Sequence, residues 1–356
     1  MDVFPARALR PAVLVCSAAL VCGCSTFGSP GGTADAARTA ADAAAVPGPV
    51  NDLESAYQRV IKDVLPSVVQ IQADEDLGSG VVYDDKGHIV TNAHVVGQAT
   101  TFQVTTADDE QPLTASLVRS YPEQDLAVIR LDKAPKGLRA AVFGDSATVQ
   151  VGHIVLAMGS PLGLSSSVTQ GIVSATGRTV SEGQTDGGTG ATIGDMVQTS
   201  AAINPGNSGG ALVNLAGRVI GIPTLAAADP GLGGAMAPGI GFAIPASTVR
   251  KIADQIVRTG KVTDSGRASL GITGRTVVDD AYRATGVALV EVQSGGAASR
   301  AGLRAGDVVT GLGTADITSV TTLSEALAAK RPGDRATVTF TRDGVGGTAE
   351  VTLGEQ

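Results

Sequence analysis

The sequence predicts a mainly β protein with two barrel-like halves followed by a small α/β unit. Its 356 residues are enough for two or three domains. The 47 glycines, among many Val, Thr and Ile residues, favour short strands joined by turns. Apolar strands recur at roughly 8–12-residue spacing, which is typical of an antiparallel barrel or sandwich. A hydrophobic content of 43% is enough for a globular core.

The first 23 residues have the pattern of an export signal. Arg7 and Arg10 precede a run of about a dozen apolar residues, which falls short of the roughly 20 needed to cross a bilayer. The run ends in VCGC, which resembles a bacterial lipobox, although Cys22 stands where Ala or Ser is commoner. The resemblance implies that Cys24 is lipidated and anchors an exported chain to the outer face of the cytoplasmic membrane. Ordinary cleavage without a lipid is the alternative.

All three cysteines, Cys16, Cys22 and Cys24, lie within residues 16–24, so the chain after Cys24 contains no thiol for a disulfide or a structural zinc site. Residues 24–50 are mostly Ala, Gly, Ser and Pro, and we expect a flexible tether. A helix follows, with Tyr57 on its apolar face and Pro66 at its end. The strands expected in the first half are 68–73, 80–83, 88–91, 101–105, 113–118 and 126–131.

The second half begins near Val149. Two glycine-rich stretches, 181–194 and 226–239, are long enough to predict functional loops. A helix is expected to begin at Ser247, as its N-cap, and to end at Gly260, before a linker at 261–267. The strands expected here lie within 153–159, 167–175, 196–201, 211–225 and 239–246.

The last 90 or so residues predict a separate α/β unit. A short helix is expected at 297–303, and a second at 322–330, opened by a capping box of Thr322 and Glu325. The expected strands are 270–275, 287–292, 307–313, 336–342 and 349–353.

Net charge argues against one class of partner. The formal charge of −8 disfavours a nucleic-acid binder, which needs a basic face to neutralise phosphates, so we expect no nucleic-acid binding.

The stretch INPGNSGGALVN, residues 203–214, places Ser208 among glycines that favour a sharp turn or a close approach. A serine hydroxyl becomes a nucleophile only with a positioned base and an orienting carboxylate. Of the three histidines, His88 and His153 are most simply structural, whereas His94 ends a predicted strand in the first half.

Asp125, which starts a later strand of that half, is the candidate carboxylate, and Asp145 remains an alternative. The order His, Asp, Ser is that of the chymotrypsin fold, a double β-barrel with its site between the barrels.

TNAHVV, DLAVIRL and NPGNSGGALVN, in this order, resemble the HtrA/DegP family of trypsin-like serine proteases. SLGI and AGLRAGDVV in the last unit resemble that family's PDZ domain. The resemblance runs from about residue 55 to the C-terminus. It implies a protease domain at 51–260 and a PDZ domain at 267–356.

The resemblance also implies site residues. The backbone N–H groups of Gly206 and Ser208 would form the oxyanion hole, where losing one donor costs about 2.7–4 kcal/mol of transition-state stabilisation. Ala202, about six residues before the nucleophile, and Ile203 would make an apolar specificity pocket that disfavours basic residues. Backbone groups of Leu270, Gly271 and Ile272 would bind a peptide's terminal carboxylate in the PDZ domain.

In this family the two long loops switch the active site, and Arg178 matches an arginine implicated in that switching. Ser200, Ala211 and Pro223 depart from the family's common Asp, Pro and Asn. The first departure puts loop coupling in doubt, and Pro223 removes one backbone donor.

The expected function is an exported, lipid-anchored serine endopeptidase that cleaves unfolded or damaged proteins without metal or cofactor and responds to C-terminal peptides at its PDZ domain. The resemblance suggests a homotrimer assembled near Tyr57. The alternative is a chaperone-like or peptide-binding lipoprotein whose protease domain is latent.

Overall fold

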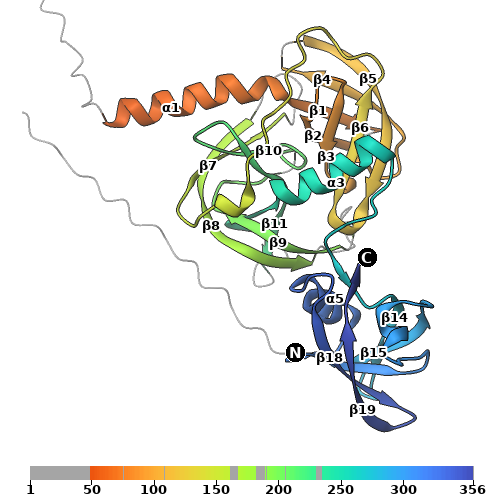
Figure 1. Ribbon diagram of the computed structural model, residues 1–356. Coiled ribbons are helices and arrows are strands. Elements are labelled where there is room, and N and C mark those ends of the chain that lie inside the picture. The colour runs from red at the N-terminus through yellow and green to blue at the C-terminus, as the bar shows by residue number, and fades with distance from the viewer. Residues whose placement is uncertain are drawn as a thin grey trace, which may run out of the picture. The chain divides into compact units, whose positions relative to one another are not determined.

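The computed structural model describes residues 49–355 except 75, 108, 161–166, 182–188, 190, 205 and 230–234 (Figure 1). The predicted signal segment, Cys24 and nearly all of the tether lie outside the described residues. The chain divides into compact units at 1–47 and 48–356, and every element below belongs to the second. The expected fold class is confirmed, because two closed six-stranded barrels precede a smaller β-rich region.

Helix α1 (Pro49–Val64) overlaps the last two residues of the predicted tether. Val60 and Val64 are buried in the barrel core, whereas residues 51–55 are exposed. The helix gives way to a 3-10 turn at Leu65–Ser67 that contains Pro66, which has no N–H for a further helical bond. The apolar stripe on its C-terminal half therefore fixes this helix to the barrel core.

The first barrel has the strand order β1-β2-β3-β6-β5-β4. Its interior is filled by β-branched and other apolar side chains such as Ile71, Ile89 and Ile129, all fully buried. Three strands have the bounds expected from the sequence. The strands are β1 (Val68–Ala73), β2 (Asp76–Val82), β3 (His88–Thr91), β4 (Thr101–Thr106), β5 (Asp109–Tyr121) and β6 (Leu126–Leu131).

The second barrel has the strand order β10-β11-β12-β9-β8-β7. Its strands run further than expected into the two glycine-rich stretches, where β8 and β12 are long. The strands are β7 (Ile154–Gly159), β8 (Ser167–Ser181), β9 (Thr192–Thr199), β10 (Ala211–Asn214), β11 (Val219–Asp229) and β12 (Ala235–Pro245).

Helix α3 (Ala246–Thr259) contacts β6 of the first barrel and β11 of the second (Figure 1). The prediction that Ser247 caps this helix is wrong. Pro245 occupies the N-cap position, and Ser247 lies inside the helix with its N–H donating to Ser146 Oγ at 3.0 Å. The predicted end is right, because Gly260 takes the left-handed conformation with φ of 70°.

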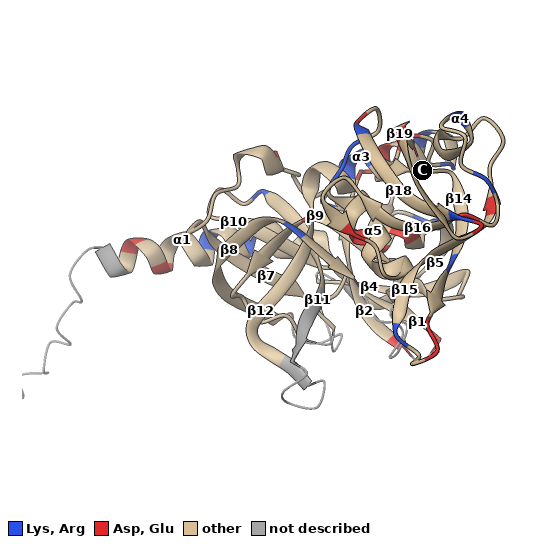
Figure 2. Ribbon diagram, turned by 90° about the horizontal axis from the view of Figure 1, so that it is seen from below, with Lys and Arg blue, Asp and Glu red and all other residues tan. Residues whose placement is uncertain are grey.

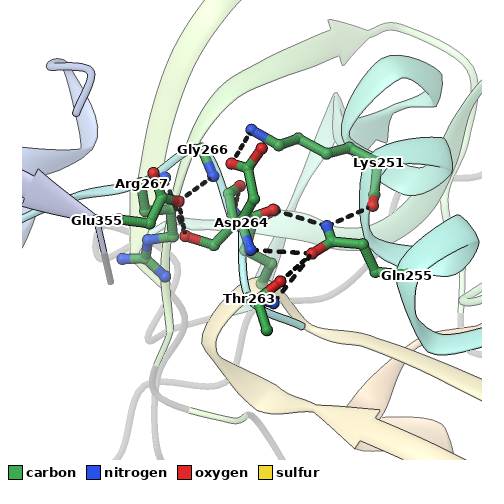
Figure 3. Close-up of polar contacts among 9 residues, drawn as sticks. Lys251, Gln255, Thr263, Asp264, Gly266, Arg267 and Glu355 are labelled. Atoms are coloured by element: carbon green, nitrogen blue, oxygen red, sulfur yellow. Dashed lines mark hydrogen bonds and ion pairs between the residues drawn. The ribbon is translucent and has the colours of Figure 1, made fainter. Parts of the chain in front are cut away.

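The linker after α3 is held by hydrogen bonds to one buried side chain (Figure 3). Gln255 Oε1 accepts from the backbone N–H groups of Thr263 and Asp264, both at 2.9 Å. Its Nε2 donates to the Asp264 carbonyl at 2.7 Å, and Lys251 forms an ion pair with the Asp264 carboxylate. On the other side Glu355 accepts from Gly266 N–H at 2.6 Å. The linker is therefore bound at both ends.

The C-terminal unit is a sheet of order β14-β15-β16-β18-β19 with two helices, and β13 pairs with β20. The predicted capping box of Thr322 and Glu325 is wrong. The N-cap of helix α5 lies three residues earlier, at Ser319, with Thr322 as its reciprocal partner. The elements are β13 (Ala268–Ser269), β14 (Ile272–Val278), β15 (Ala284–Val292), α4 (Ala297–Arg300), β16 (Val308–Leu312), β17 (Ala315–Asp316), α5 (Val320–Ala328), β18 (Arg335–Arg342), β19 (Val345–Thr352) and β20 (Gly354–Glu355).

Surface charge is mixed in sign. Figure 2 shows blue and red residues interspersed, without a continuous basic face in that view. Within the described part of the chain, no helix is both long and apolar enough to cross a membrane.

Candidate active site

The structure brings His94 and Asp125, both from segments of the first barrel, into hydrogen-bond contact. His94 lies on a single helical turn, α2 (Ala93–Val96), directly after β3. Its Nδ1 lies 2.9 Å from Asp125 Oδ2, and its backbone N–H donates to Asp125 Oδ1 at 2.9 Å. With Nδ1 bonded to the carboxylate, the imidazole can present Nε2 as a base.

Asp125 is completely buried and has a left-handed backbone with φ of 47°. It follows the 3-10 helix η2 (Pro122–Gln124), which turns the carboxylate toward α2. The buried side chain of Asn92 donates to the Asp125 carbonyl at 2.9 Å. The strained turn is thus held from both sides, and the carboxylate accepts at both of its oxygens.

Thr224, on β11 of the second barrel, joins the carboxylate to the serine. Its hydroxyl donates to Asp125 Oδ2, and its carbonyl accepts from the hydroxyl of Ser208 at 2.9 Å. A hydroxyl has one hydrogen, so Ser208 must turn from the Thr224 carbonyl toward His94 before it can give up its proton.

The glycines around Ser208 are required by close approaches. Gly209 has φ of 81°, and a Cβ there would lie 2.1 Å from the Ser79 carbonyl oxygen. A Cβ on Gly210 would lie 2.2 Å from the Met158 carbonyl oxygen. Gly206 has φ of 97°, a conformation that side chains disfavour. The glycines at 206–210 therefore permit both a sharp turn of the backbone and the close approach of neighbouring main-chain groups.

The two residues expected at the specificity pocket lie in different surroundings. Ala202 is exposed, and its carbonyl accepts from Thr169 at 2.8 Å. Ile203 is 6% exposed and belongs to the core of the second barrel, where Gly241 leaves room for it. Of the two side chains, Ala202 is the one open to a ligand.

Arg178 is exposed on β8 and donates to Gln198 at 3.2 Å. Ser200, one of the departures from the family pattern, accepts from the Ile172 N–H at 3.0 Å. Pro223 still contributes its carbonyl, which accepts from Gly209 N–H at 3.0 Å. Ala211 is buried on β10. Residues 182–188, 190 and 230–234 of the two glycine-rich stretches lie outside the described residues.

The predicted carboxylate-binding loop borders a cavity of about 160 Å³ between β14 and α5. Apolar side chains line it, among them Leu270, Ile272, Leu323 and Leu327. The Gly271 N–H donates to Ser269 Oγ at 3.0 Å, so a carboxylate there would compete with this hydroxyl. The geometry suits an extended peptide added beside β14.

The remaining candidates have local partners. His88 Nδ1 lies 2.7 Å from Asp84, and Gln150 N–H donates to His153 at 3.4 Å. Asp145 caps a 3-10 turn by accepting from Ala147 N–H at 2.9 Å. In the described ranges no cluster of three or more His, Cys, Asp or Glu residues could hold a metal ion.

Sequence reasoning missed Asn92 and Thr224. Asn92 lies two residues before His94 and could have been suspected from its place. Thr224 carries no local signal, because its partner Asp125 is 99 positions away.

Comparison with known proteins agrees with this geometry. Residues 78–222 match the trypsin-like peptidase domain, and residues 267–353 match the PDZ domain. The chain is 38% identical to serine protease PepD of Mycobacterium tuberculosis, over 84% of this chain and 66% of that protein. It is 40% identical to periplasmic serine endoprotease DegP of Escherichia coli, over 75% of this chain and 55% of that protein. The chain thus spans between about half and two thirds of these relatives.

Solved structures also resemble this chain, and the similarity covers nearly the whole of each matched structure. A serine endoprotease from Yersinia pestis is 34% identical with a TM-score of 0.55, covering 84% of this chain and 98% of that one. The HtrA-type protease AlgW with a decapeptide is 29% identical with a TM-score of 0.56, covering 84% and 98%. With its double barrel, its PDZ region and these relatives, the chain belongs to the HtrA family of trypsin-like serine proteases.

Proposed function

We propose that the chain is an exported serine endopeptidase that cleaves unfolded or damaged proteins through an acyl-enzyme. The observation that carries this proposal is the continuous set of hydrogen bonds from His94 through Asp125 and Thr224 to Ser208. These bonds bring a candidate nucleophile, base and orienting carboxylate from both barrels into one site.

In the first step His94 Nε2 takes the proton from the Ser208 hydroxyl as Oγ attacks the scissile carbonyl. Asp125 holds the ring in the productive tautomer and stabilises the imidazolium that forms. The N–H groups of Gly206 and Ser208 receive the oxyanion, and His94 then protonates the departing amine. In the second step a water gives a proton to His94 as its oxygen attacks the acyl carbon. His94 then returns that proton to Ser208 Oγ as the ester bond breaks and the acid product leaves. No metal or cofactor takes part in this scheme.

The substrate proposal rests on an apolar site. Ala202 is exposed and uncharged, so nothing at this position pairs with a basic side chain, and the pocket favours small apolar residues. The apolar cavity beside β14 supports binding of hydrophobic C-terminal peptides, which would regulate cleavage. The AlgW structure named with a decapeptide supports a peptide ligand for this family.

Export is supported by the N-terminal pattern and by relatives named as periplasmic proteases. Lipidation at Cys24, anchoring at the outer face of the cytoplasmic membrane, switching through Arg178 and a homotrimer assembled near Tyr57 belong to the same proposal. Tyr57 packs on the protease core next to the exposed first turns of α1.

One observation favours the alternative of a latent protease with chaperone-like or peptide-binding activity. The Ser208 hydroxyl donates to Thr224, so its proton is directed away from His94. Turning requires only a side-chain rotation, so this arrangement is a resting state that a ligand could shift.

The test is degradation of a reduced, unfolded protein by residues 48–356, with and without a peptide that has a hydrophobic C-terminus. Cleavage that the peptide accelerates supports both the endopeptidase and its regulation. Binding of the unfolded protein without cleavage, under both conditions, would favour the alternative.

A further inference from the structure

Ser79 lies in the first barrel but makes its contacts with the nucleophile loop of the second. It sits on β2 and is completely buried. Its sequence neighbours are Gly78 and Gly80, and neither its residue type nor its place in a strand indicates a role in the site. Every polar group of the residue is nevertheless bonded.

The backbone of Ser79 fixes the nucleophile itself. Its N–H donates to the carbonyl of Ser208 at 2.9 Å. Its own carbonyl accepts from the Thr91 hydroxyl at 2.7 Å, and the close fit of Gly209 against the same oxygen was described above. This backbone therefore defines the distance between β2 and residues 208–209.

The hydroxyl of Ser79 bridges two further segments. It donates to the carbonyl of Gly206 and accepts from the N–H of Ser160, the latter at 2.8 Å. Ser160, 8% exposed, follows β7, so three separate parts of the chain meet at one oxygen. Both partners are main-chain groups, the Ser160 N–H buried and the Gly206 carbonyl partly buried, and both would lose this partner if the hydroxyl were removed.

The bond to Gly206 bears directly on the oxyanion hole. Gly206 has φ of 97° and, as a glycine, has access to several backbone conformations. Because the peptide group is planar, holding the Gly206 carbonyl fixes the orientation of the Gly206–Asn207 peptide. Holding the Ser208 carbonyl fixes the next part of the loop. Of the two N–H donors proposed for the oxyanion, the Ser208 N–H lies between these anchored points, and the Gly206 N–H belongs to the residue whose carbonyl is the first of them.

We propose that Ser79 is a positioning residue that holds the loop 206–208 in the shape able to stabilise the oxyanion. The proposal rests on the proposed peptidase function, because it assigns Ser79 to that reaction. Ser79 touches no reacting atom and acts through Gly206 and Ser208. Its effect should appear in the chemical step and not in substrate binding.

The test compares Ser79→Ala with Ser67→Ala in residues 48–356. Ser67 is a matched control, since it is 2% exposed and belongs to the turn that leads into β1. For a chromogenic peptide, Ser79→Ala should lower kcat by about 10²-fold with KM changed by less than about twofold. A boronic acid, which places an oxygen in the oxyanion hole, should bind more weakly in the same proportion. Ser67→Ala should change neither.

Hydrogen exchange measured by mass spectrometry separates this proposal from the proposed function. Amides in 203–210 should exchange faster in Ser79→Ala, with 68–73 unchanged. If the wild-type chain fails to cleave, the proposed function fails while the exchange result still decides whether Ser79 holds the loop. If Ser79→Ala folds poorly, Ser79→Cys keeps the volume with a weak donor and should show the same losses. Unchanged kcat in an active enzyme, or unchanged exchange in 203–210, would overturn the proposal.

Discussion

The hydroxyl of Thr224 donates a hydrogen bond to the carboxylate of Asp125, although the two residues lie 99 positions apart and in different barrels. The same residue's carbonyl accepts from Ser208. Asp125 and Ser208 are therefore located relative to each other by a strand of the second barrel. Since His94 is fixed by Asp125, correct docking of the barrels is a condition for the site.

Replacing Thr224 with valine removes the hydroxyl and keeps the shape. Hydrogen bonds to charged groups contribute about 1.5–3 kcal/mol, so kcat should fall by about 10- to 100-fold with little change in KM. Steady-state kinetics on a chromogenic peptide checks this. Thr192→Val, at a buried threonine of β9, is the control. Equal kcat in Thr224→Val and wild type would show that Asp125 needs no support from the second barrel.

Asp125→Asn tests the choice of carboxylate. The amide would favour the wrong imidazole tautomer, so kcat should fall by about 10⁴-fold while the fold is retained. Asp145→Asn should leave kcat unchanged, because that carboxylate caps a distant 3-10 turn. Kinetics and circular dichroism on both variants give the answer. A large loss in Asp145→Asn alone would reverse the assignment.

Gln255→Ala should free the linker between the barrels and the PDZ region. It removes the acceptor for two backbone N–H groups and the donor to the Asp264 carbonyl. Brief digestion with a foreign protease should cut within 260–266 faster than in wild type, as judged by mass spectrometry. Gln58→Ala, on exposed α1, is the control. Equal cutting in all three proteins would mean that the linker is not held by Gln255.

The PDZ region should owe part of its acid sensitivity to Asp307. A hydrogen bond from the Arg342 guanidinium lowers the pKa of this nearly buried carboxyl below its usual value. Because the pKa is lower in the folded than in the unfolded chain, the stabilisation is complete above the ordinary pKa of about 3.9 and is lost as pH falls through the lowered pKa.

Asp307→Asn should therefore lower the free energy of unfolding at pH 7 by about 1–2 kcal/mol, a modest figure because Arg342 remains partly exposed. The difference from wild type should shrink below about pH 3.9. Urea unfolding at pH 7 and pH 3 measures it. Asp316→Asn, at an exposed aspartate, is the control. A difference that stayed constant down to pH 2 would contradict the assigned cause.

Local patterns predicted much of the fold because the barrel strands are short, apolar and bounded by turn residues. The bounds of β1, β3 and β6 follow from that pattern alone. Two-residue strands such as β13 and β20 have no pattern of their own and exist only through their pairing. The expected N-cap at Ser247 is wrong because the helix already begins at Ala246, after Pro245. The Ser247 N–H donates instead to Ser146 Oγ, 101 positions earlier in the chain.

The candidate site likewise contains residues that the sequence pattern indicates and residues that only the fold brings together. That His94, Asp125 and Ser208 belong to one candidate site could be predicted, because their residue types and chain order carry chemical meaning. Ser79 and Thr224 act through main-chain and hydroxyl contacts across the two barrels. Serine and threonine are common in strands and turns, so neither residue stands out until the barrels are docked.

The most direct test of the central claim is labelling of residues 48–356 with a fluorophosphonate, followed by mass spectrometry of the modified peptide. Such a reagent modifies a serine only when a neighbouring base activates its hydroxyl. The account predicts one adduct, on Ser208, absent from Ser208→Ala and strongly slowed in His94→Ala. An adduct on another residue, or equal labelling of Ser208→Ala, would contradict it.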